Sequence, residues 1–333
     1  MHLDIFNNDA FSVSQLTLAM NESIPREPGR IGRLGLFREE PITTTTVSIE
    51  SMGSSIALVQ TSARGAPAPV VGQERRKLRK FEVAHLAREG AVYADEVQNL
   101  RAFGSETEVE TVQNLVNRKV ALIKRNIDAT FEWHRMGALK GQVLDADGTS
   151  VLLDCFADFG VTQIVVDFAL DDDTTDVKQK CVDLKRAIRR ELGGISGGGT
   201  VRVEASPSFF DALVAHPAVK AAYDRWMSGE FLRTTQNEDG FYFGGIYWAE
   251  NDDAVGATQF VADGEAYAIP VGIRDQFIAY FAPADYLETV NTMGLPYYAK
   301  QWNMEGGKGV KIEGQSNPLF LNTRPRAVVK LTA

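Results

Sequence analysis

The sequence predicts an α+β protein with two globular parts, one dominant helix and long extensions. Apolar residues recur at spacings of three and four over one long segment, which indicates a single amphipathic helix. Segments rich in β-branched and aromatic residues lie before and after it, which indicates strands. With 333 residues, 44% of them hydrophobic, the chain is long enough for one large or two ordinary domains with real cores.

Composition excludes several classes of protein. Lys and Arg number 35 and Asp and Glu 44, a net charge of −9 that argues against a dedicated nucleic-acid binder. No run of uncharged apolar residues is long enough for a membrane span, and the N-terminal residues do not resemble a secretory signal, so we expect a cytoplasmic protein. Cys155 and Cys181 are the only cysteines, too few for a disulfide framework, and we expect buried thiols.

The first hundred residues predict an arm and an extended loop. Residues 1–36 have few apolar side chains, and we expect an N-terminal arm there. Residues 37–103 begin with the strand-like sequence PITTTTVSIE, but the prolines of GAPAP cannot continue its pairing. Such a long excursion is improbable in a self-contained domain, so we expect the missing partner of this strand in another chain. The strand residues expected at that contact are Ile42, Thr44, Val47 and Ile49.

The same region carries a basic run, ERRKLRK, at residues 74–80. It is either a solvated loop face or an electrostatic contact with an acidic partner surface. Its basic residues are Arg75, Arg76, Lys77, Arg79 and Lys80.

A single long helix is predicted from about residue 105 to residue 137, roughly 48 Å at 1.5 Å per residue. Ser105 and Glu108 form a capping-box signature, and Met136-Gly137 supplies the stop. His134 falls in the last predicted turn, where a partly charged imidazole would suit the helix dipole. The apolar stripe consists of Val109, Val112, Val116, Val120, Ile123, Ile127 and Phe131.

The elements after this helix alternate between strands and helices. The first is a hairpin at 141–160 that turns at Asp147-Gly148, followed by a helix at 177–192. A strand at 200–206 then leads to a helix that starts at Ser206-Pro207. Short strands within 231–298 and a last strand at 326–333 complete the order.

Motifs for chemistry are weak. GISGG at 194–198 matches the nucleophile-elbow pattern around Ser196, but that motif needs a strand before it and a helix after it, and the predicted order here is the reverse. No histidine has a second ligand at metal-binding spacing, and the acids at 171–173 precede a helix, whose dipole explains them. We therefore predict no catalytic, cofactor-binding or metal-binding residue. A pair of acids acting as in a glycosidase stays open, because no pair has a distinctive context.

The C-terminal residues 297–333, YYAKQWNMEGGKGVKIEGQSNPLFLNTRPRAVVKLTA, resemble the closing segment of the major capsid proteins of lambda-type tailed phages, the capsid protein E family. In that family an aromatic-rich stretch leads to a glutamine-serine-proline-leucine turn, an arginine-proline pair and a last strand. Residues 41–50, 63–104 and 200–213 resemble three earlier parts of the family in the same order. The matching C-terminal residues are Gln315, Ser316, Pro318, Leu319, Arg324 and Pro325.

The resemblance implies the tailed-phage and herpesvirus-type major capsid fold. Mapped by order, it implies an N-terminal arm at 1–36, an extended β-loop at 37–103, the spine helix and first part of the peripheral domain at 104–174, an axial domain at 175–303, and the second part of the peripheral domain at 304–333. The strand at Ile42 to Ile49 would form one side of a two-stranded loop lying across a neighbouring subunit. The basic run would meet acidic residues there.

The resemblance also implies a function. The chain would be a structural protein whose hexamers and pentamers close into an icosahedral procapsid, which expands as double-stranded DNA enters without sequence-specific binding. A separate scaffolding protein, a portal and a decoration protein are the implied partners, with assembly in the host cytoplasm, a final place in the virion capsid, and no cofactor or membrane. The hinge candidates for such a shell are Gly193, Gly194, Gly197, Gly198 and Gly199.

Two other interpretations remain. The same fold could form the shell of a bacterial nanocompartment that encloses an enzyme, and the presence of packaged DNA would distinguish the two. The chain could instead be a soluble α/β hydrolase that uses Ser196 or a pair of acids. It would then be a small oligomer with a pocket where we predict a flexible loop.

Overall fold

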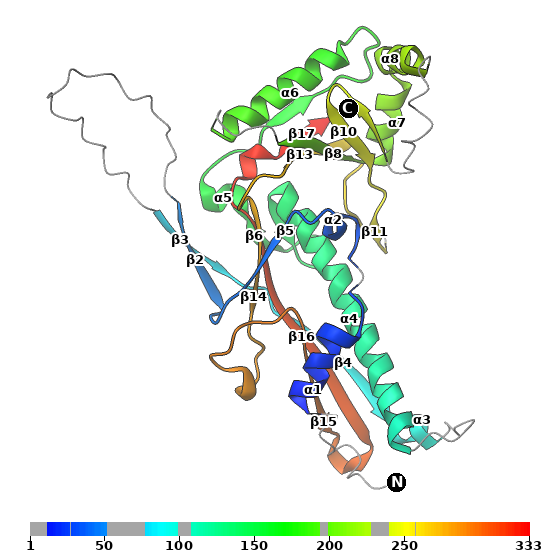
Figure 1. The fold of residues 1–333 in the computed structure, drawn as a ribbon, viewed down its shortest axis with the longest axis vertical. Helices are drawn as coiled ribbons and strands as arrows, with labels where there is room; N and C mark the ends of the chain where they lie inside the picture. The colour runs from blue at the N-terminus through cyan, green and yellow to red at the C-terminus, as the bar shows by residue number, and fades with distance from the viewer. Residues whose placement is uncertain are drawn as a thin grey trace, which may run out of the picture.

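The computed structural model describes residues 12–26, 28–51, 77–98, 108–193, 199–227, 240–256 and 258–333. Figure 1 shows an elongated molecule in which the helix α4 (Glu108–Lys140) runs along one sheet and ends near a second, helix-covered sheet. This arrangement confirms the predicted α+β fold with one dominant helix and two globular parts. Within the ranges given, no helix is both long and apolar enough to span a membrane.

The helix α4 buries five of the seven residues of the predicted apolar stripe, and the burial of the other two, Val109 and Val112, stays a prediction. Val116, Val120, Ile123, Ile127 and Phe131 are all at most 4% exposed, which confirms a single packed face. The predicted stop is wrong, because the helix continues beyond Met136-Gly137 to Lys140. A Cβ atom on Gly137 would lie 2.9 Å from the Gln142 carbonyl oxygen, so this glycine allows the returning chain to pack closely against the helix. Ser105 of the expected capping box lies outside the described residues.

His134 does not act as a charged group at the helix end. It is 1% exposed, and burial lowers the pKa of its imidazole to about 4. The side chain is therefore neutral near pH 7 and packs edge-on near Phe320, with ring centroids 6.3 Å apart. The expectation of a favourable dipole interaction is wrong because α4 extends to Lys140, which places His134 inside the core-facing surface of the helix.

The first sheet is organised around one long central strand. Its strands are β1 (Arg38–Pro41), β4 (Leu86–Tyr93), β14 (Phe277–Ala282), β15 (Tyr298–Asn303) and β16 (Gly309–Asn322). The strand β16 pairs antiparallel with β4, β14 and β15, and β1 joins β14 in parallel. Phe131 of α4 lies 5.7 Å from the ring of Phe281 and 5.6 Å from that of Phe320, which places an aromatic cluster between helix and sheet.

The second sheet has six strands in the order β7-β17-β13-β8-β10-β9. These strands are β7 (Val165–Asp167), β8 (Thr200–Ala205), β9 (Gly240–Phe243), β10 (Ile246–Glu250), β13 (Glu265–Val271) and β17 (Val329–Thr332). One face packs against α6 (Val177–Glu191), α7 (Pro207–Ala215) and α8 (Pro217–Met227) around the buried Trp248 and Phe209. Tyr267 and Ile269 of the other face pack against Met136 and Leu139 near the end of α4.

The predicted domain ranges do not coincide with the two sheets, because strands from one predicted range pair in different sheets. The strands β14 and β15 fall within 175–303 but pair in the long-helix sheet. Conversely, β17 from 304–333 and β7 from 104–174 pair in the six-stranded sheet. Hydrogen-bonded neighbours far apart in sequence decide these memberships. The division into axial and peripheral domains therefore stays a prediction.

Several local predictions are confirmed. The hairpin of β5 (Gln142–Leu144) and β6 (Val151–Asp154) surrounds a turn in which Asp147 accepts bonds from the Thr149 and Ser150 amides. Ser206 caps α7 by accepting a bond from the Phe209 amide, and Pro207 takes the first helical position. The hairpin is shorter than expected, because Asp154 caps a short helix, α5 (Cys155–Phe159).

The N-terminal arm lies on the long helix. It contains α1 (Val13–Leu18), a π-helix (Ala19–Ser23) and α2 (Arg30–Arg33). Buried Glu132 of α4 accepts bonds from the Ile31 and Gly32 amides of α2. Arg30 pairs at 3.1 Å with Glu204 of the six-stranded sheet. The arm therefore connects α4 with the second sheet.

Buried Lys124 fixes the other end of this arm. Its ammonium donates to the Met20 and Ile24 carbonyl oxygens, each at 2.6 Å, and lies 4.7 Å from the ring of Tyr297. We expect Lys124→Met to lower the free energy of unfolding by about 1–3 kcal/mol, because it leaves buried acceptors unpaired. Urea denaturation of the dissociated chain measures this. The exposed neighbour Arg125, changed to Met, is the control, and equal effects of the two changes would contradict the assignment.

Candidate inter-subunit surfaces

The extended segment forms a two-stranded ribbon. The strands β2 (Thr46–Ser51) and β3 (Lys77–Glu82) pair antiparallel, with Val47 opposite Phe81 and Ser51 opposite Lys77. Figure 1 shows this ribbon leading away from the body of the protein. Phe81 is 3% exposed and anchors the near end in the core. The strand partner expected in another chain is therefore β3 of the same chain, and the contact of the ribbon with a neighbour stays a prediction.

The four strand residues predicted at that contact are tied to their own chain to different degrees. The Ile42 amide donates to the Phe281 carbonyl oxygen at 2.9 Å, which continues the pairing of β1 with β14. Thr44 is exposed, and its hydroxyl donates to the Thr46 carbonyl oxygen at 2.7 Å. Val47 and Ile49 are partly buried hydrophobics that pack against the long-helix core. Of the four, only Thr44 is exposed, and the other three are partly buried.

The basic run divides into residues with different surroundings. Arg79 packs on α5 of its own chain, where its guanidinium donates to the Asp158 and Phe159 carbonyl oxygens at 2.5 and 3.3 Å and lies 4.9 Å from the Phe159 ring. Lys80 is exposed on β3. Arg75 and Arg76 lie outside the described residues, and Lys77 is placed only by its backbone. Arg79 therefore has an internal role that the sequence did not indicate.

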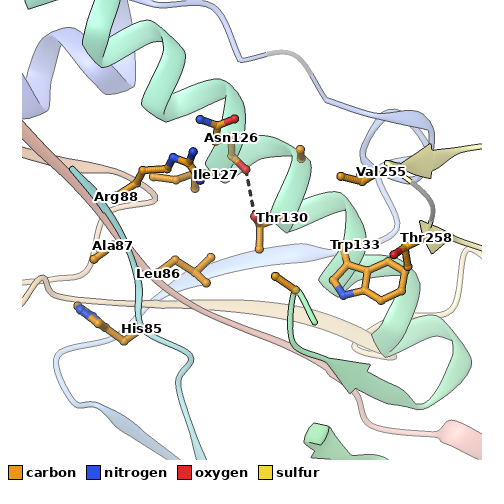
Figure 2. A pocket seen from close by; sticks show the side chains of 12 residues that line it. His85, Leu86, Ala87, Arg88, Asn126, Ile127, Thr130, Trp133, Val255 and Thr258 are labelled. Atoms are coloured by element: carbon orange, nitrogen blue, oxygen red, sulfur yellow. Dashed lines mark hydrogen bonds between the residues drawn. The ribbon is translucent and has the colours of Figure 1, made fainter. Parts of the chain in front are cut away.

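A pocket of about 350 Å³ lies beside α4. Figure 2 shows it between α4, the start of β4 and the small hairpin of β11 (Ala254–Val255) and β12 (Thr258–Gln259). Trp133 contributes an aromatic wall, and its indole nitrogen donates to the Leu144 carbonyl oxygen at 2.9 Å. The Thr130 hydroxyl is used within the helix, where it donates to the Asn126 carbonyl oxygen at 3.0 Å. Arg88 is the exposed charged residue of the lining.

This lining is chemically suited to a protein contact. His85 lies with Nδ1 2.8 Å from Asn317 Oδ1, so its imidazole is engaged at the edge of the sheet. Apolar groups from Leu86, Ile127 and Val255 make up much of the remaining wall. No nucleophile stands beside a base in this lining, and mixed apolar and polar groups are typical of interfaces between proteins. The sequence did not indicate the pocket, because its walls come from distant segments.

The predicted hinge and elbow residues lie around one loop. Gly193 has φ +86°, and a Cβ atom added there would meet nothing within 4 Å, as a hinge would need. Gly199 is tightly packed, because a Cβ there would lie 2.9 Å from the Val271 carbonyl oxygen. Gly194, Ser196, Gly197 and Gly198 lie outside the described residues. The helix α6 precedes this loop and β8 follows it, the reverse of the order that a nucleophile elbow requires.

Both cysteines of the chain are buried and free. Burial raises the pKa of both the Cys155 and Cys181 thiols to about 12, so both are protonated and unreactive near neutral pH. Within those ranges no three His, Cys, Asp or Glu side chains gather in a way that could hold a metal ion.

The fold defined by these elements is the phage capsid fold. The crystal structure of a candidate capsid protein from a prophage of Escherichia coli CFT073 superimposes with a TM-score of 0.57 at 13% identity, over 96% of this chain and 98% of that protein. Residues 12–333 match the family described as "Phage major capsid protein E", and the chain belongs to this family.

Two relatives agree with this membership. The major capsid protein of Pseudomonas phage KPP10 is 30% identical over 328 residues, which cover 92% of this chain and 93% of the relative. The major capsid protein of Salmonella phage Felix O1 is 27% identical over 346 residues, which cover 94% of each. The resemblance drawn from the C-terminal residues is thereby confirmed.

Proposed function

We propose that this chain is the structural major capsid protein of a tailed phage, assembling as hexamers and pentamers into an icosahedral head that encloses double-stranded DNA. The observation that carries the proposal is the match to the phage major capsid protein E family over residues 12–333. The phage capsid fold and the two major capsid proteins among the relatives support it.

The shape of the subunit suits closed rings. A ring of identical chains needs two different surfaces on each chain, one that meets the next subunit and one that meets the previous one. In Figure 1 the ribbon of β2 and β3 leaves one side of the molecule, and β11, which borders the pocket beside α4, lies on the other. The ribbon of each subunit would then lie over the next, where the exposed Lys80 and the basic run meet acidic side chains.

The acidic composition suits a container for DNA. A net charge of −9 disfavours tight binding to a polyanionic backbone, so packaged DNA can be held without specific contacts. A scaffolding protein, a portal and a decoration protein would be separate chains, and assembly would take place in the host cytoplasm before the protein reaches the virion. A nanocompartment shell is the second candidate, because it would use the same fold, and the contents of the particle distinguish the two. The hydrolase interpretation has no support from the family or its relatives.

Negative-stain electron microscopy of the expressed protein, alone and with its scaffolding protein, tests this proposal. The expected result is shells tens of nanometres across, or rings of five and six subunits, after separation on a gradient. A discrete small oligomer under both conditions would contradict the proposal and favour the enzyme interpretation. Nuclease-protected DNA in particles from infected cells would support the phage head over a nanocompartment.

The basic run gives a more local prediction. We expect the combined change Arg75→Gln, Arg76→Gln, Lys77→Gln and Lys80→Gln to reduce the rate of assembly at low salt by roughly tenfold and to flatten its salt dependence, because steering between charged surfaces is screened by salt. Light scattering during assembly measures both effects.

Arg79 supplies the matched control for this variant. Its guanidinium is engaged with α5 of its own chain, so Arg79→Gln is expected to lower stability by about 1 kcal/mol with little change in salt dependence. Unaltered assembly of the fourfold variant would show that the basic run is a solvated surface.

A further inference from the structure

One loop presents large apolar side chains to solvent. It comprises residues 286–295, between β14 and β15, and is called the apolar loop below. Leu287 is 91% exposed, Val290 61%, Met293 56% and Leu295 42%. Single exposed apolar residues are common, but a cluster of this kind on one short segment marks an interaction site.

The apolar loop is held in shape by its own polar groups. The Thr289 hydroxyl is buried and donates to the Ala284 carbonyl oxygen at 2.7 Å, and the Thr292 hydroxyl donates to the Thr289 carbonyl oxygen at 2.7 Å. The Thr289 side chain thus points inward, whereas Leu287, Val290 and Met293 are exposed. The hydrogen bonds give the exposed apolar groups a defined geometry, which lowers the entropy lost when a partner covers them.

The loop is anchored beside the root of the ribbon. The Gly294 amide donates to the Ile42 carbonyl oxygen at 2.9 Å, four residues before β2 begins at Thr46. A side chain at Gly294 would collide with the Phe281 carbonyl group, so the close approach requires glycine. Figure 1 shows the segment between β14 and β15 on the same side of the molecule as β2 and β3. The apolar loop and the ribbon therefore form one continuous flank.

We propose that the apolar loop is a contact surface that a second copy of this chain covers in the assembled shell. The inference rests on the proposed function, because a closed ring places the next copy along the flank from which the ribbon extends. The surroundings fit such an interface, because charged groups lie on or next to the apolar loop: Glu288 pairs with Lys300 at 2.8 Å, and Asp285 is exposed. Polar groups at the edge of an apolar contact are typical of protein interfaces. An isolated chain gains nothing from this exposure, whereas the shell removes it from water.

A single introduced cysteine tests the inference. Both natural thiols are buried and protonated, so in the Val290→Cys variant a maleimide reports on position 290 alone. We expect labelling in assembled shells to be at least about tenfold slower than in dissociated subunits, because groups in an interface core are packed like a protein interior. Thr174→Cys, at an exposed threonine in the loop before α6 that lines neither the apolar loop nor the pocket beside α4, is the matched control and is expected to show little protection.

The outcomes separate this inference from the proposed function. Shells that form normally but label at position 290 as fast as free subunits would overturn the inference and leave the proposed function standing. Equal protection at positions 290 and 174 would do the same. Protection that arises only when another phage protein is added would also overturn it, because the occupant would not be a second copy. Absence of any ring or shell would contradict the proposed function together with the inference.

Discussion

Replacing Phe131 by alanine is expected to lower the free energy of unfolding of the dissociated subunit by about 3–5 kcal/mol, the range for removing a buried aromatic ring. The ring is fully buried and lies 5.5 Å from the ring of Tyr297, 5.7 Å from Phe281 and 5.6 Å from Phe320. Its loss would leave a cavity where the long helix packs against β14 and β16. Urea denaturation followed by circular dichroism measures the change.

The control for this variant lies on the same helix. Leu122 is 57% exposed, so Leu122→Ala is expected to change stability by no more than about 0.5 kcal/mol. A loss below about 1 kcal/mol for Phe131→Ala would mean that the aromatic cluster does not carry the packing of α4 against β16.

Shortening the ribbon is expected to abolish closed shells while leaving the subunit folded. Ser51 and Lys77 are directly paired across β2 and β3, so residues 52–76 can be replaced by the two-residue turn Asn-Gly. Phe81 and the rest of the core are untouched, and the far-UV circular dichroism and urea midpoint of the subunit should stay close to those of the intact chain. Electron microscopy and gradient sedimentation would then show subunits or small rings in place of shells.

A second variant tests whether shell closure needs only the length of the ribbon or also the contacts of its side chains. Replacing residues 52–76 by a glycine-serine linker of equal length keeps the span and removes the native side chains. If the ribbon acts through specific contacts with a neighbour, this variant should also fail to close shells. Closed shells of normal size from the Asn-Gly variant would falsify the proposed role of the ribbon in assembly.

The spacing of apolar residues predicted the buried face of the long helix but not its C-terminal end. Spacings of three and four predicted the buried face from Val116 to Phe131, because a helix that packs on one sheet must repeat its apolar residues every turn. The same reasoning ended the helix too early, at Gly137. That glycine is needed for the close approach of Gln142, a tertiary contact that no local pattern reveals. The wrong state of His134 followed from this error.

The candidate surfaces were predicted only in part. The ribbon was expected from its β-branched residues and prolines, but Arg79 was assigned to a neighbour and instead packs on Phe159, which lies far along the sequence. The apolar loop was not singled out, because the sequence does not show whether the rest of the chain covers Leu287, Val290 and Met293. Only the solvent exposure of these side chains shows that the chain itself leaves them uncovered.

The sequence by itself determined the α+β class, the single long helix, most local elements and, through its C-terminal residues, the resemblance to phage capsid proteins. These follow from local preferences and from the period of apolar residues, which act over a few turns of chain. The tertiary structure decided which sheet each strand joins, how the arm is pinned by Lys124 and Glu132, and which apolar residues stay exposed. Those properties depend on contacts between residues far apart in sequence, which only the folded chain brings together.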